Sequence, residues 1–447
     1  MKEREANLGS RVWLAIVVFG LFGQIAWVIE NMYFNIFVYK TITEDPDAIA
    51  LMVAASAVVA TLTTLLIGAL SDKLGKRKVF ISIGYIVWGL VIALFAHISV
   101  ANSALIFPHK DHLQLIAITV LIVVVMDCVM TFFGSTANDA AFNAWVTDVT
   151  SEKNRARVEG VLSALPLVAI LVVFGGLDPL IRGERWDLFY YTVGGMVTLS
   201  GILGLFLLED RCDKREGTSY LKDIIFGFRI SAIRANRVLY LVFTAILIIS
   251  TAFQVFMPYL LIYIENYLQV EDYALILGVV IILSAAASIV LGRLVDRYGK
   301  GRFIIPGMII FSLGCLMMFI LGKTMAAGDG VAIAALTVCG TIMMAGNLLL
   351  MLVLNALARD KMPGTQRGHF NGIRMIFSVM LPMIIGPLIG SNIIKASRTT
   401  FIDEFGLVQS VPIPEIFLAA SLLSLLLIVP AIFILKALKP QQRAPLS

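Results

Sequence analysis

Four ionisable side chains interrupt long apolar stretches of the chain, and each could do chemistry inside a membrane. They are Glu30, Asp127, Asp139 and Arg374. On translocon scales such a residue costs roughly 2.5–3.5 kcal/mol at the centre of a membrane helix, so it marks a candidate functional site. Asp127 is the least able to reach the membrane surface, because it lies between the apolar runs VLIVVVM and CVMTFF. Asp139 and Arg374 could instead reach the membrane surface along their stems or pair with each other.

Polar side chains recur at helical spacing in four of the apolar stretches. Steps of three and four residues place such side chains on one helix face. For a single amide, an interhelical hydrogen bond worth about 0.6 kcal/mol is the simpler explanation, but four stripes together favour a polar cavity. Amides can bond vicinal hydroxyls and an aromatic face can stack on a sugar ring. We therefore expect a site for a hydroxylated solute that includes Gln24, Trp27, Asn31, Asn35, Thr131, Asn138, Gln254, Tyr259 and Asn347.

Twelve apolar segments must hold these residues, since a membrane helix needs about 20 mostly apolar residues. The chain of 447 residues is 59% hydrophobic and 15% charged. This composition excludes a soluble enzyme, a disulfide-built secreted module and a disordered chain. The fourth segment is too long for one straight span, and we expect it to kink at Gly134–Ser135. The predicted spans are 13–38, 48–71, 79–99, 113–147, 157–178, 187–208, 237–263, 273–292, 303–322, 331–357, 369–394 and 414–435.

The distribution of Lys and Arg predicts the orientation of these spans. With the N-terminus in the cytoplasm, 27 of the 35 Lys and Arg residues fall in inside segments and 7 in outside segments. This positive-inside signal predicts an integral protein of the plasma membrane (the inner membrane of a bacterium) with both termini cytoplasmic. The formal net charge of +5 is then explained by basic residues in the cytoplasmic segments, where they attract anionic lipid headgroups. It does not indicate a nucleic-acid partner.

An internal repeat divides the spans into two sets of six. The pattern NAxxxD, followed by Arg and Gly at fixed intervals, ends the fourth span and recurs 212 positions later at the end of the tenth. Duplicated halves around a central pathway are typical of transporters. We expect an all-α membrane protein with two pseudo-symmetric six-helix bundles at 1–208 and 237–447. A cytoplasmic linker at 209–236 joins them, and its stretch Thr218–Arg234 predicts an amphipathic surface helix.

Two loops carry a second repeat. GALSDKLGKRK at Gly68–Lys78 resembles the GxxxDxxGRRK loop between the second and third helices of the major facilitator superfamily, and GRLVDRYGKGR at Gly292–Arg302 resembles its copy between the eighth and ninth. The resemblance implies twelve helices in two bundles, a cavity lined by the first, fourth, seventh and tenth helices, and rocker-switch alternating access. Glycines allow tight turning, and the acid can accept hydrogen bonds from Arg. We expect a cytoplasmic gate at Asp72, Gly75, Arg77, Asp148 and Arg155, with a twin at Asp296, Gly299, Arg302, Asp360 and Arg367. Anchoring of the loops at lipid headgroups is the alternative.

A looser resemblance covers the first, second, fourth and fifth helices. FGQIAWVIENMYFNIFVY and NDAAFNAWVTDVTSEKNRARVEG resemble sucrose transporters and glycoside–pentoside–hexuronide:cation symporters. Melibiose-type members of that branch carry a Lys–Asp pair where this chain has Gln24–Ile25, and aspartates where it has Ala60 and Thr64. These departures argue against a sodium site of that design. Binding a proton removes the cost of burying a carboxylate, so we expect proton coupling through Glu30, Asp127 and Asp139, with Arg374 as a fourth coupling residue.

These features predict a secondary active transporter that carries a small hydroxylated solute, a saccharide or glycoside, by proton symport. The alternative is an exporter or lipid transporter for amphipathic molecules, since 18 Met and 27 Phe can line an adaptable cavity. A sensor or channel subunit is disfavoured because the chain has no filter-like segment. HExxH, GxSxG and GxxxxGK[ST] are absent, so we do not expect an enzyme. The four cysteines are far apart and lack CxxC spacing, which predicts no metal site. We expect a monomer without cofactor, whose partners are the solute, protons and the lipid bilayer.

Overall fold

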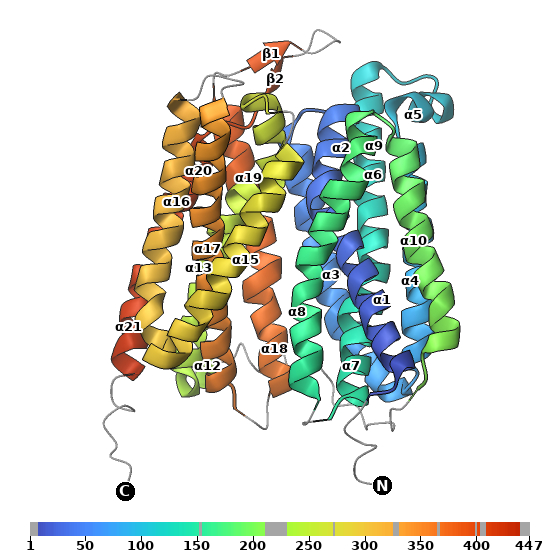
Figure 1. The fold of residues 1–447 in the computed structure, drawn as a ribbon. Helices are drawn as coiled ribbons and strands as arrows, with labels where there is room; N and C mark the ends of the chain where they lie inside the picture. The colour runs from blue at the N-terminus through green and yellow to red at the C-terminus, as the bar shows by residue number, and fades with distance from the viewer. Residues whose placement is uncertain are drawn as a thin grey trace, which may run out of the picture. The chain divides into compact units, whose positions relative to one another are not determined.

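Twelve long helices dominate the structure, a computed structural model that describes residues 8–151, 154–210, 230–270, 273–324, 330–363, 367–397, 400–402 and 408–438 (Figure 1). Each predicted span falls on a helical segment that is long and apolar enough to cross a bilayer, so the twelve spans are confirmed within the described residues. These segments are Ser10–Thr41, Pro46–Ser71, Arg77–His97, His112–Val149, Arg157–Arg182, Trp186–Leu207, Arg237–Tyr267, Tyr273–Val295, Lys300–Thr324, Ile333–Lys361, Phe370–Ala396 and Glu415–Leu438.

The chain divides into two compact units. Unit 1 comprises Met1–Thr43 and Ala55–Leu221, and unit 2 comprises Glu44–Ala54 and Lys222–Ser447. The start of the second span therefore belongs to unit 2, although the rest of that span belongs to unit 1. The predicted linker helix over 218–234 lies mostly outside the described residues, since 211–229 are not described. The predicted domain limits stay a prediction.

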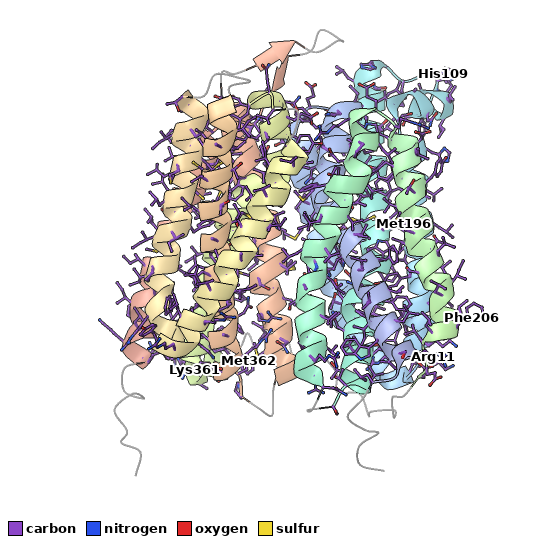
Figure 2. All side chains as sticks on the ribbon, viewed as in Figure 1. Arg11, His109, Met196, Phe206, Lys361 and Met362 are labelled. Atoms are coloured by element: carbon purple, nitrogen blue, oxygen red, sulfur yellow. The ribbon has the colours of Figure 1, made fainter. Side chains whose placement is uncertain are left out.

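In unit 1, π-helical turns interrupt three of the apolar spans. Figure 1 shows its long helices side by side between two common ends, and Figure 2 shows Arg11 at one end and His109 at the other. The elements are α1 (Ser10–Val28), η2 (Ile29–Tyr33, π), α2 (Phe34–Thr41), α3 (Pro46–Leu74, with its first residues in unit 2), α4 (Arg77–Leu94), η3 (Phe95–His97), α5 (Val100–Ile106), α6 (His112–Gly134), η4 (Ser135–Phe142, π), α7 (Asn143–Val149), α8 (Arg155–Val172), η5 (Val173–Leu177, π), α9 (Asp178–Arg182) and α10 (Trp186–Leu207).

Unit 2 repeats this pattern of long helices with short π and 3₁₀ interruptions, and Figure 1 shows a small hairpin at one of its ends. The hairpin was not predicted; its strands pair antiparallel, with Thr400 opposite Ser410. The elements are α12 (Ile230–Ala235), α13 (Arg237–Phe256), η6 (Met257–Tyr259), α14 (Leu260–Ile262), η7 (Tyr263–Tyr267), α15 (Tyr273–Tyr298), η8 (Lys300–Phe303), α16 (Ile304–Thr324), α17 (Gly330–Lys361), α18 (Arg367–Met375), η10 (Ile376–Met380), α19 (Leu381–Ala396), β1 (Thr400–Ile402), β2 (Val408–Ser410), α20 (Glu415–Leu425) and α21 (Ile428–Leu438).

Glycines of the internal repeat sit where helices meet closely. A Cβ placed on Gly134 of α6 would lie 2.8 Å from the Trp88 ring of α4. Its repeat partner Gly346 of α17 lies even closer to α16, since a Cβ there would meet the backbone nitrogen of Phe311 at 2.5 Å. Only glycine permits such approach. Part of the sequence repeat is therefore a packing requirement of equivalent helix pairs in the two units.

The predicted break in the fourth span coincides with a change of helix type. α6 ends at Gly134 and the π-helix η4 begins at Ser135. A π turn closes i→i+5 hydrogen bonds and so holds more residues than an α turn, and such turns are frequent at functional sites. The change of helix type falls between two candidate residues, Asp127 and Asp139, and sets which way the second one faces.

Candidate functional site

Three carboxyl side chains from two spans converge in unit 1. Glu30 projects from η2, Asp127 from α6 and Asp139 from η4. Glu30 is 7% exposed and Asp127 is 1% exposed, whereas Asp139 is partly exposed. Both aspartates lie close enough to Glu30 for their charges to act on it. The structure therefore brings together three of the four predicted coupling residues.

Glu30 and Asp127 are each held by a neutral hydroxyl. Thr131 donates its hydroxyl to Glu30 Oε1 at 2.8 Å, and Ser56 of α3 donates to Asp127. Glu30 Oε2 and Asp127 Oδ1 are buried without a hydrogen-bond partner in the described part of the chain. Two such carboxylates would repel each other, and an unpaired buried charge is costly. Binding one proton removes the repulsion, and binding a second removes the remaining buried charge.

Asp139 accepts hydrogen bonds from two residues of its own helix segment. The Ser135 hydroxyl lies 3.1 Å from Oδ2 and the Asn138 amide lies 3.4 Å from Oδ1, and the Trp27 side chain lies close to this carboxyl group. Among the described residues of unit 1, no Lys, Arg or His forms an ion pair with Asp139, Glu30 or Asp127. The three acids thus share a polar but uncompensated environment.

Tyr85 of α4 fixes the amide next to Asp139. Its hydroxyl lies 2.7 Å from the Phe19 carbonyl oxygen and 2.9 Å from Asn138 Oδ1, so the two acceptors share one proton. Gly23 leaves room for this contact, since a Cβ there would lie 2.5 Å from both the Tyr85 hydroxyl and Asn138 Oδ1. A larger residue at position 23 would disrupt the arrangement.

Three packed aromatic side chains, Trp27, Tyr85 and Trp88, lie next to the acids. The Trp27 and Trp88 rings are 5.3 Å apart, and the Tyr85 and Trp88 rings are 5.4 Å apart. Trp88 is fully buried, and its indole nitrogen has no partner in the described region. Sequence reasoning missed Ser56, Ser135, Tyr85 and Trp88. The signal that could have found Ser135 is its spacing of four residues from both Thr131 and Asp139.

The predicted polar stripe of the first span splits in the structure. Asn31 is exposed, whereas Asn35 is 1% exposed, because the π turns of η2 change the rotation between them. Both amides donate to their own helix, Asn31 to the Trp27 carbonyl at 2.8 Å and Asn35 to the Asn31 carbonyl at 2.9 Å. Gln24 and Trp27 are partly exposed. The open face of the first span therefore carries Gln24, Trp27 and Asn31 but not Asn35.

A second cluster anchors the segment that carries Glu30. The Tyr33 hydroxyl donates to Asp178 Oδ1 at 3.1 Å, and Arg182 pairs with Asp178 Oδ2 at 2.7 Å. Tyr33 and Asp178 are almost fully buried. Since Tyr33 is in the same π-helix as Glu30, this cluster helps to fix the position of the carboxyl group.

The predicted residues of unit 2 are more dispersed. Tyr259 is fully buried and lies 2.9 Å from the Pro387 carbonyl oxygen and 3.2 Å from that of Pro46, so its hydroxyl serves packing. Gln254 and Asn347 are partly exposed. Arg374 donates to Asn355 Oδ1 at 3.0 Å and forms no ion pair with a described carboxylate of its own unit.

The predicted gate of unit 1 contains a buried ion pair. Arg77 at the start of α4 is 3% exposed; its Nε lies 3.2 Å from Asp148 Oδ2, and the guanidinium also contacts the Ser71 hydroxyl. Gly75 has φ 66°, in the left-handed region, which lets α3 turn into α4. Arg155 is exposed and contacts a loop hydroxyl. The side chain of Asp72 lies outside the described residues.

The twin in unit 2 is built differently. Gly299 again has a left-handed φ, 93°, but Asp360 pairs with Lys300 while Arg302 is exposed. The repeat explains the difference, because Gly301 stands at the position equivalent to Arg77. The side chains of Asp296 and Arg367 lie outside the described residues. The gating role of both clusters stays a prediction.

Twelve spanning helices, two units and repeated helix contacts define a polytopic transporter fold. The chain matches the Major Facilitator Superfamily over residues 12–353 and 242–447. It belongs to this family of secondary transporters and is not an enzyme. No curated protein matches the sequence. No group of three or more His, Cys, Asp or Glu in the described residues could hold a metal ion.

Solved structures support the same fold. A variant of the nucleoside transporter NupG is similar with a TM-score of 0.70 at 11% identity, covering 95% of this chain and 100% of that chain. A bacterial homolog of the human lysosomal transporter Spinster, in an inward-facing and occupied conformation, has a TM-score of 0.64 at 13% identity, covering 98% of this chain and 99% of that chain. Identities this low show the fold alone.

Proposed function

We propose that this transporter carries a small hydroxylated solute by proton symport, with Glu30, Asp127 and Asp139 as the proton-binding groups. The observation that carries the proposal is the cluster of three carboxyl groups in the spans of unit 1 that have no cationic partner among the described contacts. Acids of this kind are expensive in a membrane unless they bind a proton, a cation or a ligand.

Protons fit this cluster better than a metal ion. Hydroxyl donors hold one oxygen each of Glu30 and Asp127, and a donor hydroxyl directs its hydrogen, not its lone pairs, at the carboxylate. A cation site would need those lone pairs to point inward. Arg374 has no described carboxylate partner in unit 2. We therefore keep it as a fourth coupling residue, because a cation without a paired carboxylate is sensitive to a change of charge on the acids.

The proposed class of solute is inferred from the side chains on the face of unit 1 beside these acids. Gln24, Trp27 and Asn31 are open to contact, and Asn138 and Thr131 lie behind them next to the carboxyl groups. Amides with an indole suit a ring that carries several hydroxyl groups. Saccharides and glycosides have this chemistry, and so do nucleosides, the cargo in the name of the similar NupG structure.

The biological setting follows from the Lys and Arg distribution. The proposal places the protein in a plasma or bacterial inner membrane as a monomer, with both termini in the cytoplasm. The Arg77–Asp148 pair would then lie at the cytoplasmic end of unit 1 and would break when that end opens.

Reconstitution into proteoliposomes loaded with a pH-sensitive dye tests the function. Sucrose, maltose and uridine are added outside in turn, with sodium present or absent. We expect at least one of them to acidify the lumen, and we expect this acidification without sodium. Solute uptake that requires sodium and moves no protons would contradict the coupling. Export of a lipophilic cation with no response to the three solutes would favour the amphipathic-substrate alternative.

A further inference from the structure

Four polar side chains recur every four residues along the fourth span: Asp127, Thr131, Ser135 and Asp139. In an α-helix four residues turn about 400°, so each step drifts by about 40° around the axis. The wider turns of η4 begin at Ser135 and rotate each residue less, which offsets the drift. The first three side chains are at most 1% exposed, and the fourth is partly exposed. The change of helix type thus keeps a polar line on one side of the fourth span.

Hydrogen bonds join most of this line to its neighbours. Thr131 donates to Glu30 at 2.8 Å, and Ser135 donates to Asp139 at 3.1 Å. Glu30 Oε2 and Asp127 Oδ1 are buried and unpartnered within the described residues, although each belongs to a strong acceptor. Buried polar atoms in this state are the usual binding points of internal water. The line therefore contains acceptors that are ready for a further donor.

We infer that this line is a proton path inside unit 1, in which the hydroxyl groups of Thr131 and Ser135 relay protons between the Asp127–Glu30 pair and Asp139. This inference rests on the proposed proton symport and assigns its route. Each hydroxyl oxygen accepts one proton and releases its own, so it ends unchanged. One proton enters at Asp127, one leaves at Asp139, and no electron moves. A water on Glu30 Oε2 would complete the step toward Ser135.

The geometry gives the path a length and an opening. From residue 127 to residue 139 the helix rises by up to ~18 Å, more than half of a hydrocarbon core of about 30 Å. Asp139 is the partly exposed end. Gln24, Trp27 and Asn31 lie on the first span, which also supplies Glu30, so the solute face and the proton path are neighbours in the same unit.

The other titratable groups that face this line do not compete for the proton. Tyr85 of α4 faces Asp139, but its hydroxyl is committed to Phe19 and Asn138. Tyr190 of α10 is close enough for the charge of Asp127 to act on it, and Cys128 is close to both Asp127 and Glu30. Both are much weaker acids than a carboxylic acid. The carboxyl and hydroxyl groups of the line are thus the groups that transfer the proton.

Removing one hydroxyl at a time tests the path in two ways. Thr131→Val and Ser135→Ala keep side-chain size and remove the proton carrier, whereas Thr131→Ser and Ser135→Thr restore it. Ser200→Ala is the matched control, since that buried hydroxyl bonds only the Val197 carbonyl of its own helix. In proteoliposomes, with the solute that drives proton entry in the wild type, exchange of labelled solute should persist in Ser135→Ala, Ser135→Thr and the control Ser200→Ala, whose residues lie outside the proposed solute site. Proton entry should fall in Thr131→Val and Ser135→Ala by about 100-fold, the lower end of what a positioned proton-transfer group contributes.

The second measurement needs no solute. Infrared spectroscopy follows deuteration of the protonated Asp127 carboxyl at acidic pH after transfer to D₂O, with the band assigned by its loss in Asp127→Asn. We expect Thr131→Val to slow deuteration of Asp127 and to leave the partly exposed Asp139 unchanged. Unchanged deuteration of Asp127 in both Thr131→Val and Ser135→Ala would overturn the path, even if proton symport itself holds. The opposite outcome is also distinguishable. If the wild type shows no proton entry, but removing the hydroxyl groups still slows deuteration of Asp127, the proposed function is rejected and the path is retained.

Discussion

At the scale of single residues, the decisive feature is whether a buried charged group has a partner. Glu30 and Asp127 carry unpartnered oxygens in the described structure, whereas Arg77 and Asp148 satisfy each other. Removing one member of a buried ion pair typically costs 3–5 kcal/mol, because the remaining charge is uncompensated. Exposed pairs contribute at most about 1 kcal/mol. The two kinds of charge should therefore respond differently to mutation.

Neutralising Arg77 should destabilise the protein more than neutralising Lys300. Arg77→Gln leaves Asp148, which is 14% exposed, without its cation. Lys300→Gln breaks a pair whose members are 32% and 52% exposed. We expect a fall in the thermal unfolding midpoint of several degrees for Arg77→Gln in detergent, and little change for Lys300→Gln. Equal effects would contradict the reading of Arg77–Asp148 as a buried bond, and recovery in the double variant Arg77→Gln, Asp148→Asn would support it.

Residue types identified the acids but not their partners. Glu30, Asp127 and Asp139 stand out in the sequence because charge is rare in apolar runs. Ser56 and Tyr85 do not stand out, because a hydroxyl on a membrane helix most often bonds its own backbone, as Thr64 does to Ala60. Which hydroxyl meets an acid depends on how spans pack, and side-chain spacing within one span does not contain that information.

At the scale of elements, small interruptions of helix type decide which residues face one another. The spans were predictable from apolar length, and so was the break at Gly134–Ser135. The π turns of η2 and η4 were not, because no residue type demands them. They explain why Asn35 leaves the predicted stripe of the first span and why Asp139 stays in line with Ser135.

The α4–α10 contact provides a matched test of packing. A Cβ on Gly194 would lie 2.5 Å from the Gly89 carbonyl oxygen, whereas a Cβ on its neighbour Gly195 would meet nothing within 4 Å. We expect Gly194→Ala to lower the free energy of unfolding by about 1–3 kcal/mol, the usual cost of overpacking. Gly195→Ala should have no cost or a gain of up to about 1 kcal/mol from helix propensity. Tryptophan fluorescence during heating measures both; a more stable Gly194→Ala would show that these helices are not in close contact.

At the scale of the whole molecule, composition, the distribution of charge and the repeated motifs together predicted the class of protein well. Twelve spans, two repeated halves and the Major Facilitator Superfamily all follow from patterns that need no packing information. The finer branch, the solute and the coupling ion do not, since they depend on a few side chains that low-identity structural similarity leaves open.

The predicted orientation can be measured on intact cells. In a background without the four native cysteines, His109→Cys is placed in the exposed loop beside α5, and Lys76→Cys in the exposed turn before α4. A maleimide that does not cross membranes should label His109→Cys from outside. It should label Lys76→Cys only after the cells are opened. The reverse pattern would place the Arg77–Asp148 pair outside and overturn the cytoplasmic termini.

We propose that the buried acids of unit 1 couple proton entry to solute uptake, and neutral replacements of these acids test this coupling most directly. Glu30→Gln and Asp127→Asn mimic the protonated state and cannot release a proton. In proteoliposomes under an inward proton gradient, we predict that both variants exchange labelled solute across the membrane but no longer accumulate it against its gradient. Accumulation at the wild-type level in both variants, with proton entry intact, would contradict the account.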